Sequence, residues 1–456
     1  MDLPIQYMQN MQKLLGDEYP EYAASFSCKS LHGLRVNNLK LETREIEKLL
    51  NAELNPIPFV KNGFYYDEDL RPAKSPYYNA GLFYLQEPSA MLSADRLPIE
   101  EGDFVLDLCA APGGKSTAVL SKLNGTGFLL ANDCSYSRAQ ALLKNLELFG
   151  GNNFCVCAEY PEKLSGIYKG FFDKILVDAP CSGEGMFRKD PSLIKDWINK
   201  GPEYYAPIQR DILDSAVSML KYGGMLLYST CTFSPLEDEE NIKYILDKYP
   251  ELTLVNIDKN YGIMPGILEM SEAARVYPHK AGGEGHFLCL IKKESVEETS
   301  CRRGACFSSD TDLKKCTELI DFFKLINKKS IKENICINKG NVYSLPLGYE
   351  ALYDRSIRFL RTGLLIGEID RNLRFKPHSA LALSLKADDF SNVLNLSKDD
   401  VRTDKYLRGE TIFVEDKDTG VKDGYVLICV DGFGLGFGKL SCNKLKNLLG
   451  KGYVKL

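Results

Sequence analysis

Residues 107–116 read Asp-Leu-Cys-Ala-Ala-Pro-Gly-Gly-Lys-Ser, and this stretch decides the fold. The apolar residues 104–106 before it are typical of a buried strand. Residues 117–123 after it form a helical pattern that ends at Asn124-Gly125. A strand that turns through Pro-Gly-Gly into a helix brings bare backbone N–H groups close to a ligand. The alternative interpretation is an ordinary tight turn between a strand and a helix.

Two nucleotide-binding motifs can be tested here by their spacing. A phosphate-binding P-loop needs glycine at position 109, which is Cys109, and the G-x-G-x-x-G pattern of dinucleotide sites is absent. An acid, Asp107, ends the first strand, and a second acid, Asp133, follows the apolar run 126–132. Because an acid after the second strand suits a ribose hydroxyl pair, we expect an adenosine-bearing cofactor without a pyrophosphate.

Length and composition describe an ordinary protein of several domains. The chain has 456 residues, too many for one core, with 44% hydrophobic and 26% charged residues. It has no run of 18 apolar residues, and its first residues lack the pattern of a signal peptide. We therefore expect a cytoplasmic protein without a membrane span. The net charge of −5 argues against a uniformly basic surface but leaves room for local basic stripes.

The fourteen cysteines are expected to be free thiols. No C-x-x-C pair occurs, the close pairs are Cys155/Cys157 and Cys301/Cys306, and the four histidines are scattered. Cys155 and Cys157 occupy alternating positions of an expected strand. The sequence therefore predicts no metal site.

The pattern of elements divides the chain into four parts. Residues 1–95 are predicted to form a small α/β appendage, with helical patterns over residues 7–15 and 44–50. Residues 96–295 alternate strands with helices, which predicts an α/β core with a doubly wound, mostly parallel sheet. Residues 296–380 read as a linker followed by a mixed connecting domain, and residues 381–456 as a β-rich module. In the core we expect strands at 104–108, 127–132, 154–158, 174–177, 224–229 and 285–292, and helices at 137–149 and 209–220.

Basic residues gather toward the C-terminus. Arg355, Arg358 and Arg361 recur every three residues, and from Gly432 onward the chain has five lysines and no acid. Such stripes suit phosphate contacts with a nucleic acid, although a run of charge is usually only a solvated face.

Two cysteines follow two expected strands of the core. Cys181 lies in Asp178-Ala-Pro-Cys-Ser-Gly, and Cys231 lies in Ser229-Thr-Cys-Thr-Phe-Ser-Pro. In a doubly wound sheet both turns can face one cleft, although packing is the default role of a cysteine. A thiolate can add to C6 of a pyrimidine and make C5 a carbon nucleophile. Asp178 is placed to bind or protonate the ring at N3 as the thiolate adds.

These motifs carry a resemblance to a known family. DLCAAPGGKS, DAPCSG and STCTFSPLEDEEN, in this order and spacing, resemble the RNA cytosine-C5 methyltransferases of the NSUN (Nol/Nop/Sun) family over residues 80–295. Residues 3–4, 14–16, 33–37, 283–287 and 374–383 are similar to bacterial RsmF-like enzymes. Those enzymes modify small-subunit (16S) ribosomal RNA and carry a PUA-like module at the C-terminus.

The resemblance implies a Rossmann-like methyltransferase core and a PUA-like RNA-binding module. It implies S-adenosyl-L-methionine as the cofactor and RNA as the partner, as small-subunit rRNA or as an assembling ribosomal subunit. We expect a monomer. Cys231 is assigned as the nucleophile, Cys181 as the group that helps to remove the C5 proton, and Asp178 as a contact to both cofactor and base. The cofactor-binding residues would be Cys109, Ala110, Ala111, Pro112, Gly113, Gly114, Lys115, Asp133, Glu159 and Asp178. Glu159 stands where the family often has aspartate.

Three alternatives stay open at this point. A DNA cytosine-C5 methyltransferase would place its nucleophile in a Pro-Cys pair, which Pro180-Cys181 supplies. A tRNA cytosine-C5 methyltransferase would share the chemistry but not the substrate. A non-catalytic ribosome-assembly factor could retain the fold, although the intact cysteine pair and cofactor loop argue against it.

Overall fold

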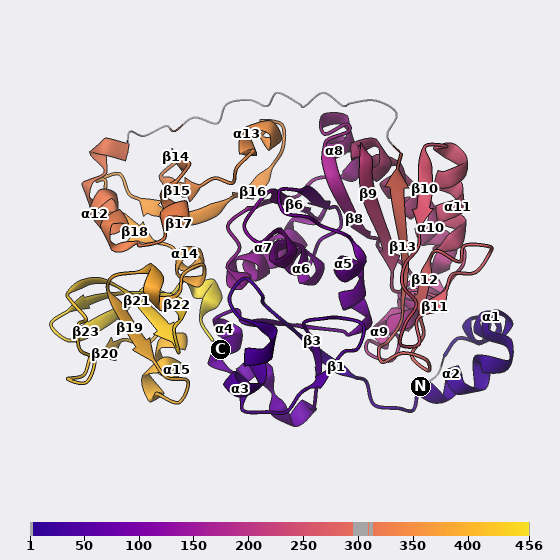
Figure 1. Cartoon of the computed structure of the whole chain (residues 1–456), viewed down its shortest axis with the longest axis horizontal. Helices are drawn as coiled ribbons and strands as arrows, with labels where there is room; N and C mark the ends of the chain where they lie inside the picture. The colour runs from indigo at the N-terminus through magenta and orange to yellow at the C-terminus, as the bar shows by residue number, and fades with distance from the viewer. Residues whose placement is uncertain (1–2, 295–308, 310–312, 456) are drawn as a thin grey trace.

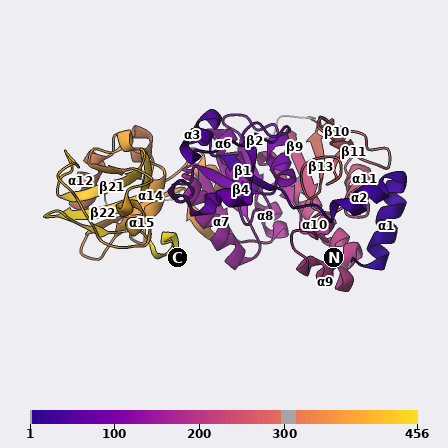
Figure 2. The same cartoon turned by 90° about the horizontal axis from the view of Figure 1, so that it is seen from below.

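The computed structural model describes residues 3–294, 309 and 313–455 (Figure 1). The predicted linker residues 295–300 and the pair Cys301/Cys306 lie outside the described residues. A large α/β core occupies the middle of the molecule, and the two C-terminal parts lie together at one end (Figures 1 and 2). None of the described helices is long and apolar enough to cross a membrane.

The core sheet confirms the predicted doubly wound α/β fold. Its strand order is β11-β12-β13-β9-β8-β5-β6-β7-β16, with β10 paired to β13. The five central strands run parallel, and β13 runs antiparallel beside β9. The bounds are β5 (Phe104–Asp107), β6 (Phe128–Asn132), β7 (Phe154–Cys157), β8 (Phe172–Asp178), β9 (Leu220–Thr230), β10 (Leu252–Val255), β11 (Met264–Pro265), β12 (Ala274–Val276) and β13 (His286–Lys293). Each predicted core strand is present, and β8 and β9 are longer than predicted.

Helices cover both faces of this sheet because its strands are apolar on both sides. Neighbouring residues of β5 show this: Val105 packs into one core cluster and Leu106 into another. The first cluster contains α5 (Leu92–Arg96), α6 (Gly114–Leu123) and α7 (Tyr136–Phe149). The second contains α8 (Pro161–Ile167), α10 (Gly201–Met219) and α11 (Glu239–Lys248).

The N-terminal part combines a small antiparallel sheet with helices on two sides of the molecule. The sheet order is β2-β3-β1-β4, formed by β2 (Asn55–Pro56), β3 (Gly63–Tyr66), β1 (His32–Val36) and β4 (Phe83–Gln86). The predicted helices are present as α1 (Ile5–Leu15) and α3 (Ile46–Leu50), and α4 (Pro76–Asn79) precedes β4. An additional helix, α2 (Tyr19–Ser25), packs with α1 against α9 (Ser192–Asn199) through Tyr7, Tyr22 and Trp197.

The third part adds a strand to the core sheet. Besides α12 (Thr317–Leu325) and α13 (Tyr349–Leu352), it has a sheet of β14 (Ile335–Asn338), β15 (Asn341–Ser344), β17 (Leu364–Ile369) and β18 (Phe375–Pro377). Its strand β16 (Phe359–Thr362) pairs antiparallel with β7. This pairing covers a sheet edge that would otherwise be open.

The C-terminal part is β-rich, as predicted. Its sheet order is β19-β21-β22-β23-β20, formed by β19 (Val393–Leu396), β21 (Gly424–Val430), β22 (Phe433–Ser441), β23 (Lys444–Asn447) and β20 (Ile412–Phe413). Two helices, α14 (Ser379–Leu383) and α15 (Val401–Leu407), accompany it. Leu394 and Ile428 of this part share one core cluster with Leu34 and Phe83 of the N-terminal part. The division into four parts stays a proposal, since apolar contacts continue across it.

Candidate active site

Parallel strands of the core end along one edge of the sheet. Strands β5 and β8 end at Asp107 and Asp178, while Asp133 and Cys231 directly follow β6 and β9. The register pairs Asp178 with Ser229 on β9, so the ends of β8 and β9 lie side by side. Ligands in such sheets bind outside the carboxyl ends of the strands. The predicted site residues are therefore gathered at one edge.

Hydrogen bonds hold the turn between β5 and α6. The N–H of Ala110 donates to the carbonyl of Asn132 at 2.7 Å, and Arg138 donates to the carbonyl of Ala111 at 3.0 Å. Gly113 has a φ of 113°, a backbone angle that residues other than glycine rarely adopt. The loop of residues 109–115 therefore has a defined path over the strand ends.

The N-terminal sheet supports this turn from behind. The buried Arg35 donates to the carbonyl of Gly114 at 2.9 Å and to Oγ1 of Thr117 at 2.7 Å. A Cβ on Gly114 would lie 3.0 Å from the ring of Tyr84 and 3.1 Å from Gln86. A side chain at position 114 would therefore press against Tyr84 and Gln86, and the N-terminal part fixes the start of α6.

Two buried carboxylates at the strand ends have oxygens without hydrogen-bond partners. Asp107 accepts from Ser116 at 2.6 Å through one oxygen, and its Oδ1 has no partner. Asp133 accepts from the N–H of Ser135 at 3.0 Å, and its Oδ2 has only the ion pair with Arg138 at 3.3 Å. Burial raises the pKa of Asp107 to about 7. Both acids suit a ligand that brings an ammonium group and hydroxyl donors, as S-adenosyl-L-methionine does.

Lys115 contacts Asp178 directly. Its Nζ lies 2.7 Å from Oδ2 of Asp178, and Ser229 donates to Oδ1 of Asp178 at 3.0 Å. Burial is the largest single influence and would raise the pKa of Asp178, but the charge of Lys115 together with the hydrogen bonds from Lys115 and Ser229 holds that pKa below its ordinary value. His286 lies 3.8 Å from Asp178 and 3.0 Å from the Ser93 hydroxyl. Burial lowers the pKa of His286 to about 3, so its ring is neutral at neutral pH.

The two predicted catalytic cysteines meet at this edge of the sheet. Their Sγ atoms are 3.3 Å apart, and both side chains are partly exposed. The N–H of Gly185 donates to the carbonyl of Cys231 at 2.8 Å, which ties the two turns together. The hydrogen bond to Cys231, together with burial, raises the pKa of Cys181 well above its ordinary value.

A buried carboxylate supports the turn that carries Cys181. Glu237 accepts from the N–H of Ser182 at 2.9 Å and from Nε2 of Gln209 at 2.8 Å. Gln209 also donates to the carbonyl of Pro180 at 2.9 Å. Burial raises the pKa of Glu237 to about 7. The backbone on both sides of Cys181 is thereby held in place.

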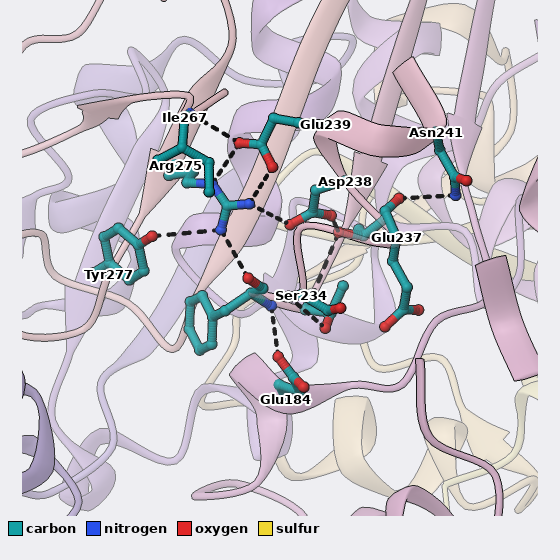
Figure 3. A network of polar contacts seen from close by, with 12 residues as sticks. Glu184, Ser234, Glu237, Asp238, Glu239, Asn241, Ile267, Arg275 and Tyr277 are labelled. Atoms are coloured by element: carbon teal, nitrogen blue, oxygen red, sulfur yellow. Dashed lines mark hydrogen bonds and ion pairs between the residues drawn. The ribbon is translucent and has the colours of Figure 1, made fainter. Parts of the chain in front are cut away.

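The loop after Cys231 is fixed by a buried ion network (Figure 3). Arg275 on β12 donates to Glu239 at 2.7 Å, lies 3.2 Å from Asp238 and donates to the carbonyl of Phe233 at 3.0 Å. The N–H of Phe233 donates to Glu184 at 3.0 Å. The position of Cys231 thus depends on the buried charges of Arg275, Asp238 and Glu239.

Two of the predicted cofactor-binding residues, Glu159 and Cys109, have surroundings within the protein that need no ligand. Glu159 pairs with Lys163 at 2.8 Å and accepts from the N–H of Arg358 at 2.7 Å, so it joins the third part to the core. Burial raises the pKa of Cys109 well above its ordinary value. Their roles in cofactor binding stay predictions.

Several functional residues were not assigned from the sequence. Ser229, His286 and Glu237 lie inside the motifs named above, but nothing in their local pattern indicated that they support Asp178 or Cys181. Lys115 was expected at the cofactor, and the structure places its ammonium on Asp178. In the described part of the chain, no three His, Cys, Asp or Glu side chains are grouped as metal ligands.

The sheet order, the glycine-containing turn after β5 and the acids at the strand ends define a Rossmann-like methyltransferase. Matches to family models extend this to most of the chain. Residues 94–292 match "16S rRNA methyltransferase RsmB/F" and residues 3–88 match "N-terminal domain of 16S rRNA methyltransferase RsmF". Residues 321–385 match "RsmF rRNA methyltransferase first C-terminal domain", and residues 391–455 match "Methyltransferase RsmF PUA domain".

Individual proteins agree with these matches. Ribosomal RNA small subunit methyltransferase F of Shewanella piezotolerans is 30% identical over 94% of this chain and 93% of its own length. A methyltransferase homolog of Pyrococcus horikoshii is 29% identical, covers 61% of this chain and 91% of its own, and has a TM-score of 0.54. NSun6 from the same organism, solved with SFG, shares the fold at 23% identity and a TM-score of 0.57, over 64% of this chain and 98% of its own.

This chain belongs to the ribosomal RNA small subunit methyltransferase F family. The predicted membership among RsmF-like enzymes of the NSUN type, and the predicted PUA-like module, are confirmed.

Proposed function

We propose that this protein transfers a methyl group from S-adenosyl-L-methionine to C5 of cytosine in small-subunit (16S) ribosomal RNA. The curated relatives carry that RNA in their name, and family models for the RsmF enzymes match all four parts of the chain. The target is rRNA, free or in an assembling subunit, which fits a cytoplasmic enzyme. The monomeric state remains a prediction.

One observation carries the assignment of chemistry: two thiols 3.3 Å apart beside a carboxylate that stays ionised. Cys231 as a thiolate forms a bond from Sγ to C6, and the electrons of the C5=C6 double bond make C5 nucleophilic. After C5 has gained a methyl group, loss of its proton restores the double bond and expels Cys231. Two thiol groups suit these two steps, because one forms the bond to C6 and the other accepts the proton from C5.

The electrostatics of the pair support this division of roles. The hydrogen bond to Cys231 and burial raise the pKa of Cys181, so in this proposal Cys181 keeps its proton and can donate its S–H to the negative charge of the attacking Cys231. Once Cys231 is bonded to C6, it no longer carries that charge. Cys181 then loses the interaction that held its proton, releases that proton to solvent, and as a thiolate accepts the proton from C5.

Asp178 and the loop of residues 109–115 complete the site. The Asp178 carboxylate would accept hydrogen bonds from the amino group of cytosine and from a protonated N3, which stabilises the charge that develops in the ring. Lys115 keeps this carboxylate ionised. The loop and the partnerless oxygens of Asp107 and Asp133 would hold S-adenosyl-L-methionine, which supplies the methyl group as an electrophile.

The test uses three variants and one denaturing gel. With S-adenosyl-L-methionine and 16S RNA, Cys181→Ala should attack, methylate and then stall. It should therefore accumulate an RNA–protein adduct that survives denaturation. Cys231→Ala and the Cys181→Ala/Cys231→Ala double variant should form no adduct, while binding the cofactor with an affinity close to that of the wild type.

The other outcomes identify the alternatives. A DNA-type arrangement predicts the reverse pattern, with the adduct trapped in Cys231→Ala. A packing role for Cys181 predicts lower stability and no adduct, and a non-catalytic factor predicts no tritiated methyl transfer from the wild type. Parallel reactions with 16S RNA, assembled small subunits, tRNA and DNA separate the substrates; preference for tRNA would contradict the proposal.

A further inference from the structure

A cavity of about 300 Å³ opens where the parts of the chain meet. Its lining includes Lys40 of the N-terminal part, Gly125 and Asn152 of the core, Lys328 of the third part and Lys386 just after α14. Gly125 and Asn152 precede β6 and β7, whereas the catalytic residues follow the strands. The cavity therefore lies at the opposite edge of the sheet from Cys231 and is separate from the active site.

The charge of this cavity is predominantly positive. Lys40, Lys328 and Lys386 line it together with one acid, Asp389, whose carboxylate accepts from the N–H of Lys386 at 2.9 Å. Among the described residues, no carboxylate lies within salt-bridge distance of the three ammonium groups. Lys40 donates to the carbonyls of Ala80 at 2.6 Å and Leu148 at 3.2 Å. Neutral carbonyls satisfy hydrogen bonds but leave the charges uncompensated.

The three lysines repel one another across the cavity. Burial and then the charges of Lys328 and Lys386 lower the pKa of Lys40 to about 7. An anion would stabilise such a cluster of like charges, because it favours the charged form of each lysine. Side chains of Asn152 and Ser330 on the same wall add neutral hydrogen-bond donors.

We infer that this cavity binds a phosphate group, as an anchoring site remote from the reaction. The phosphate can belong to the backbone of the RNA substrate or to a free phosphate compound, since both present the same oxygens to the three lysines. The RNA backbone is a suitable source of this phosphate, because a long RNA substrate can reach both edges of the sheet. The inference does not depend on the chemistry at Cys231.

The test substitutes the two lysines that are not deeply buried. Lys328→Gln/Lys386→Gln removes two charges and leaves the buried Lys40 and its carbonyl contacts in place. The control, Lys248→Gln/Lys292→Gln, removes two charges from half-exposed lysines near the far end of the sheet. Unchanged S-adenosyl-L-methionine affinity and a single cooperative unfolding transition establish that both variants fold.

Two probes distinguish the sources of the phosphate. In calorimetry, inorganic pyrophosphate should bind the Lys328→Gln/Lys386→Gln protein roughly tenfold or more weakly than the control, because charge-assisted hydrogen bonds are removed. For a 16S RNA fragment, the salt dependence of binding should become weaker. Each phosphate that the variant no longer neutralises should reduce the steepness of the plot of log K against log salt by about 0.7–0.9. A tenfold rise in salt then lowers the affinity roughly sixfold less for each such phosphate.

Weaker binding in the RNA arm assigns the cavity to the RNA backbone, and weaker binding of pyrophosphate alone assigns it to a free phosphate compound. If neither probe distinguishes the variant from the control, the inference is wrong.

A pH series with sulfate adds a second criterion. An anion raises the pKa of Lys40, so binding should take up a proton and weaken as the pH rises above about 7. The other charged groups that face the cavity are Lys328, Lys386 and Asp389. Sulfate binding without proton uptake would contradict the involvement of Lys40.

Discussion

At the residue scale, the site depends on which group of each close pair carries the charge. Lys115 lies 2.7 Å from Asp178, and its charge, together with the hydrogen bonds from Lys115 and Ser229, keeps that carboxylate ionised although burial opposes this. Cys181 retains its proton because Cys231 lies beside it. A neighbour, rather than the residue itself, therefore decides the protonation state of each functional group. This dependence on neighbours is also why residue type alone could not assign the roles of the two cysteines.

Asp133 is expected to contribute to cofactor affinity. Its Oδ2 is buried and has no hydrogen-bond partner, so a ribose hydroxyl can donate to it. Asp133→Ala should weaken S-adenosyl-L-methionine binding by about 1.5–3 kcal/mol in calorimetry, as expected for hydrogen bonds to a charged group. The exposed Asp321→Ala serves as the control and should bind like the wild type. Equal affinity of the Asp133 and Asp321 variants would remove Asp133 from the site.

Asp107 should make the stability of the free protein depend on pH. Its pKa in the folded protein is about 7, well above the ordinary value of an aspartate. Between the two pKa values the folded state binds more protons than the unfolded state, so the free energy of unfolding falls as the pH rises to about 7 and then levels off. The effect is roughly 1.4 kcal/mol per unit of pKa shift.

The variant Asp107→Asn should lack this part of the pH dependence. Urea unfolding at pH 5, 6, 7 and 8 should show the variant gaining on the wild type up to about pH 7, with no further gain at pH 8. A difference that stays constant over this range would mean that Asp107 does not titrate there.

At the scale of elements, the turns that carry Cys181 and Cys231 are held by contacts with buried side chains. Glu237 supports the turn after β8, and the network of Arg275, Asp238 and Glu239 supports the turn after β9. All four side chains are buried. The sequence after Cys231 contains four consecutive acids, Glu237 to Glu240; Glu237 binds Ser182 and Gln209, while Asp238 and Glu239 share Arg275.

Arg275→Met should be strongly destabilising, because it leaves Asp238 and Glu239 buried without their cation. Removing one partner of a buried ion pair costs about 3–5 kcal/mol, measured as the free energy of unfolding in urea. Arg188→Met provides a comparison, since Arg188 pairs with the single carboxylate Glu284. It should cost less than Arg275→Met. If Arg275→Met unfolds at the same urea concentration as the wild type, the network does not hold the turn.

Local sequence patterns predicted the elements of the core well and their tertiary additions poorly. The apolar runs before Asp107, Asp178 and Cys231 placed three parallel strands, and each is present. Strand β16 was not predicted, because residues 359–362 gain their strand form by pairing with β7, which is distant in sequence. The arginines 355, 358 and 361 were interpreted as a basic stripe. Instead, Arg361 pairs with the buried Glu147, and Arg358 lies 4.2 Å from the centre of the Tyr136 ring.

At the scale of the whole molecule, the C-terminal part is continuous with the N-terminal part. Besides the shared apolar cluster, Tyr77 donates to Asp431 at 2.7 Å and Lys398 donates to the carbonyl of Leu49 at 3.3 Å. Deleting the C-terminal part would expose this cluster and would change stability as well as RNA binding. Its contribution to RNA binding is therefore better tested with surface substitutions.

The strands β22 and β23 offer the surface for that test. Lys439 and Lys446 are directly opposite each other, and Lys444 lies two residues from Lys446 on the same face; all three are exposed. Like charges opposite each other destabilise a sheet, and the only offset seen for Lys439 among the described residues is the ring of Tyr425, whose centre lies 5.3 Å from its Nζ. Phosphate groups of an RNA would offset the repulsion.

Replacing Lys439, Lys444 and Lys446 together by glutamine should weaken the binding of 16S RNA. The slope of log K against log salt should fall by about 0.7–0.9 for each phosphate that these lysines no longer neutralise, while S-adenosyl-L-methionine affinity stays unchanged. Because the substitutions relieve repulsion, the variant should unfold no more easily than the wild type, which separates an effect on binding from an effect on folding. The control replaces three exposed lysines of the core helices, Lys195, Lys243 and Lys248. A salt slope equal to that of this control would mean that the lysines of the hairpin are only solvated and that the RNA is held elsewhere.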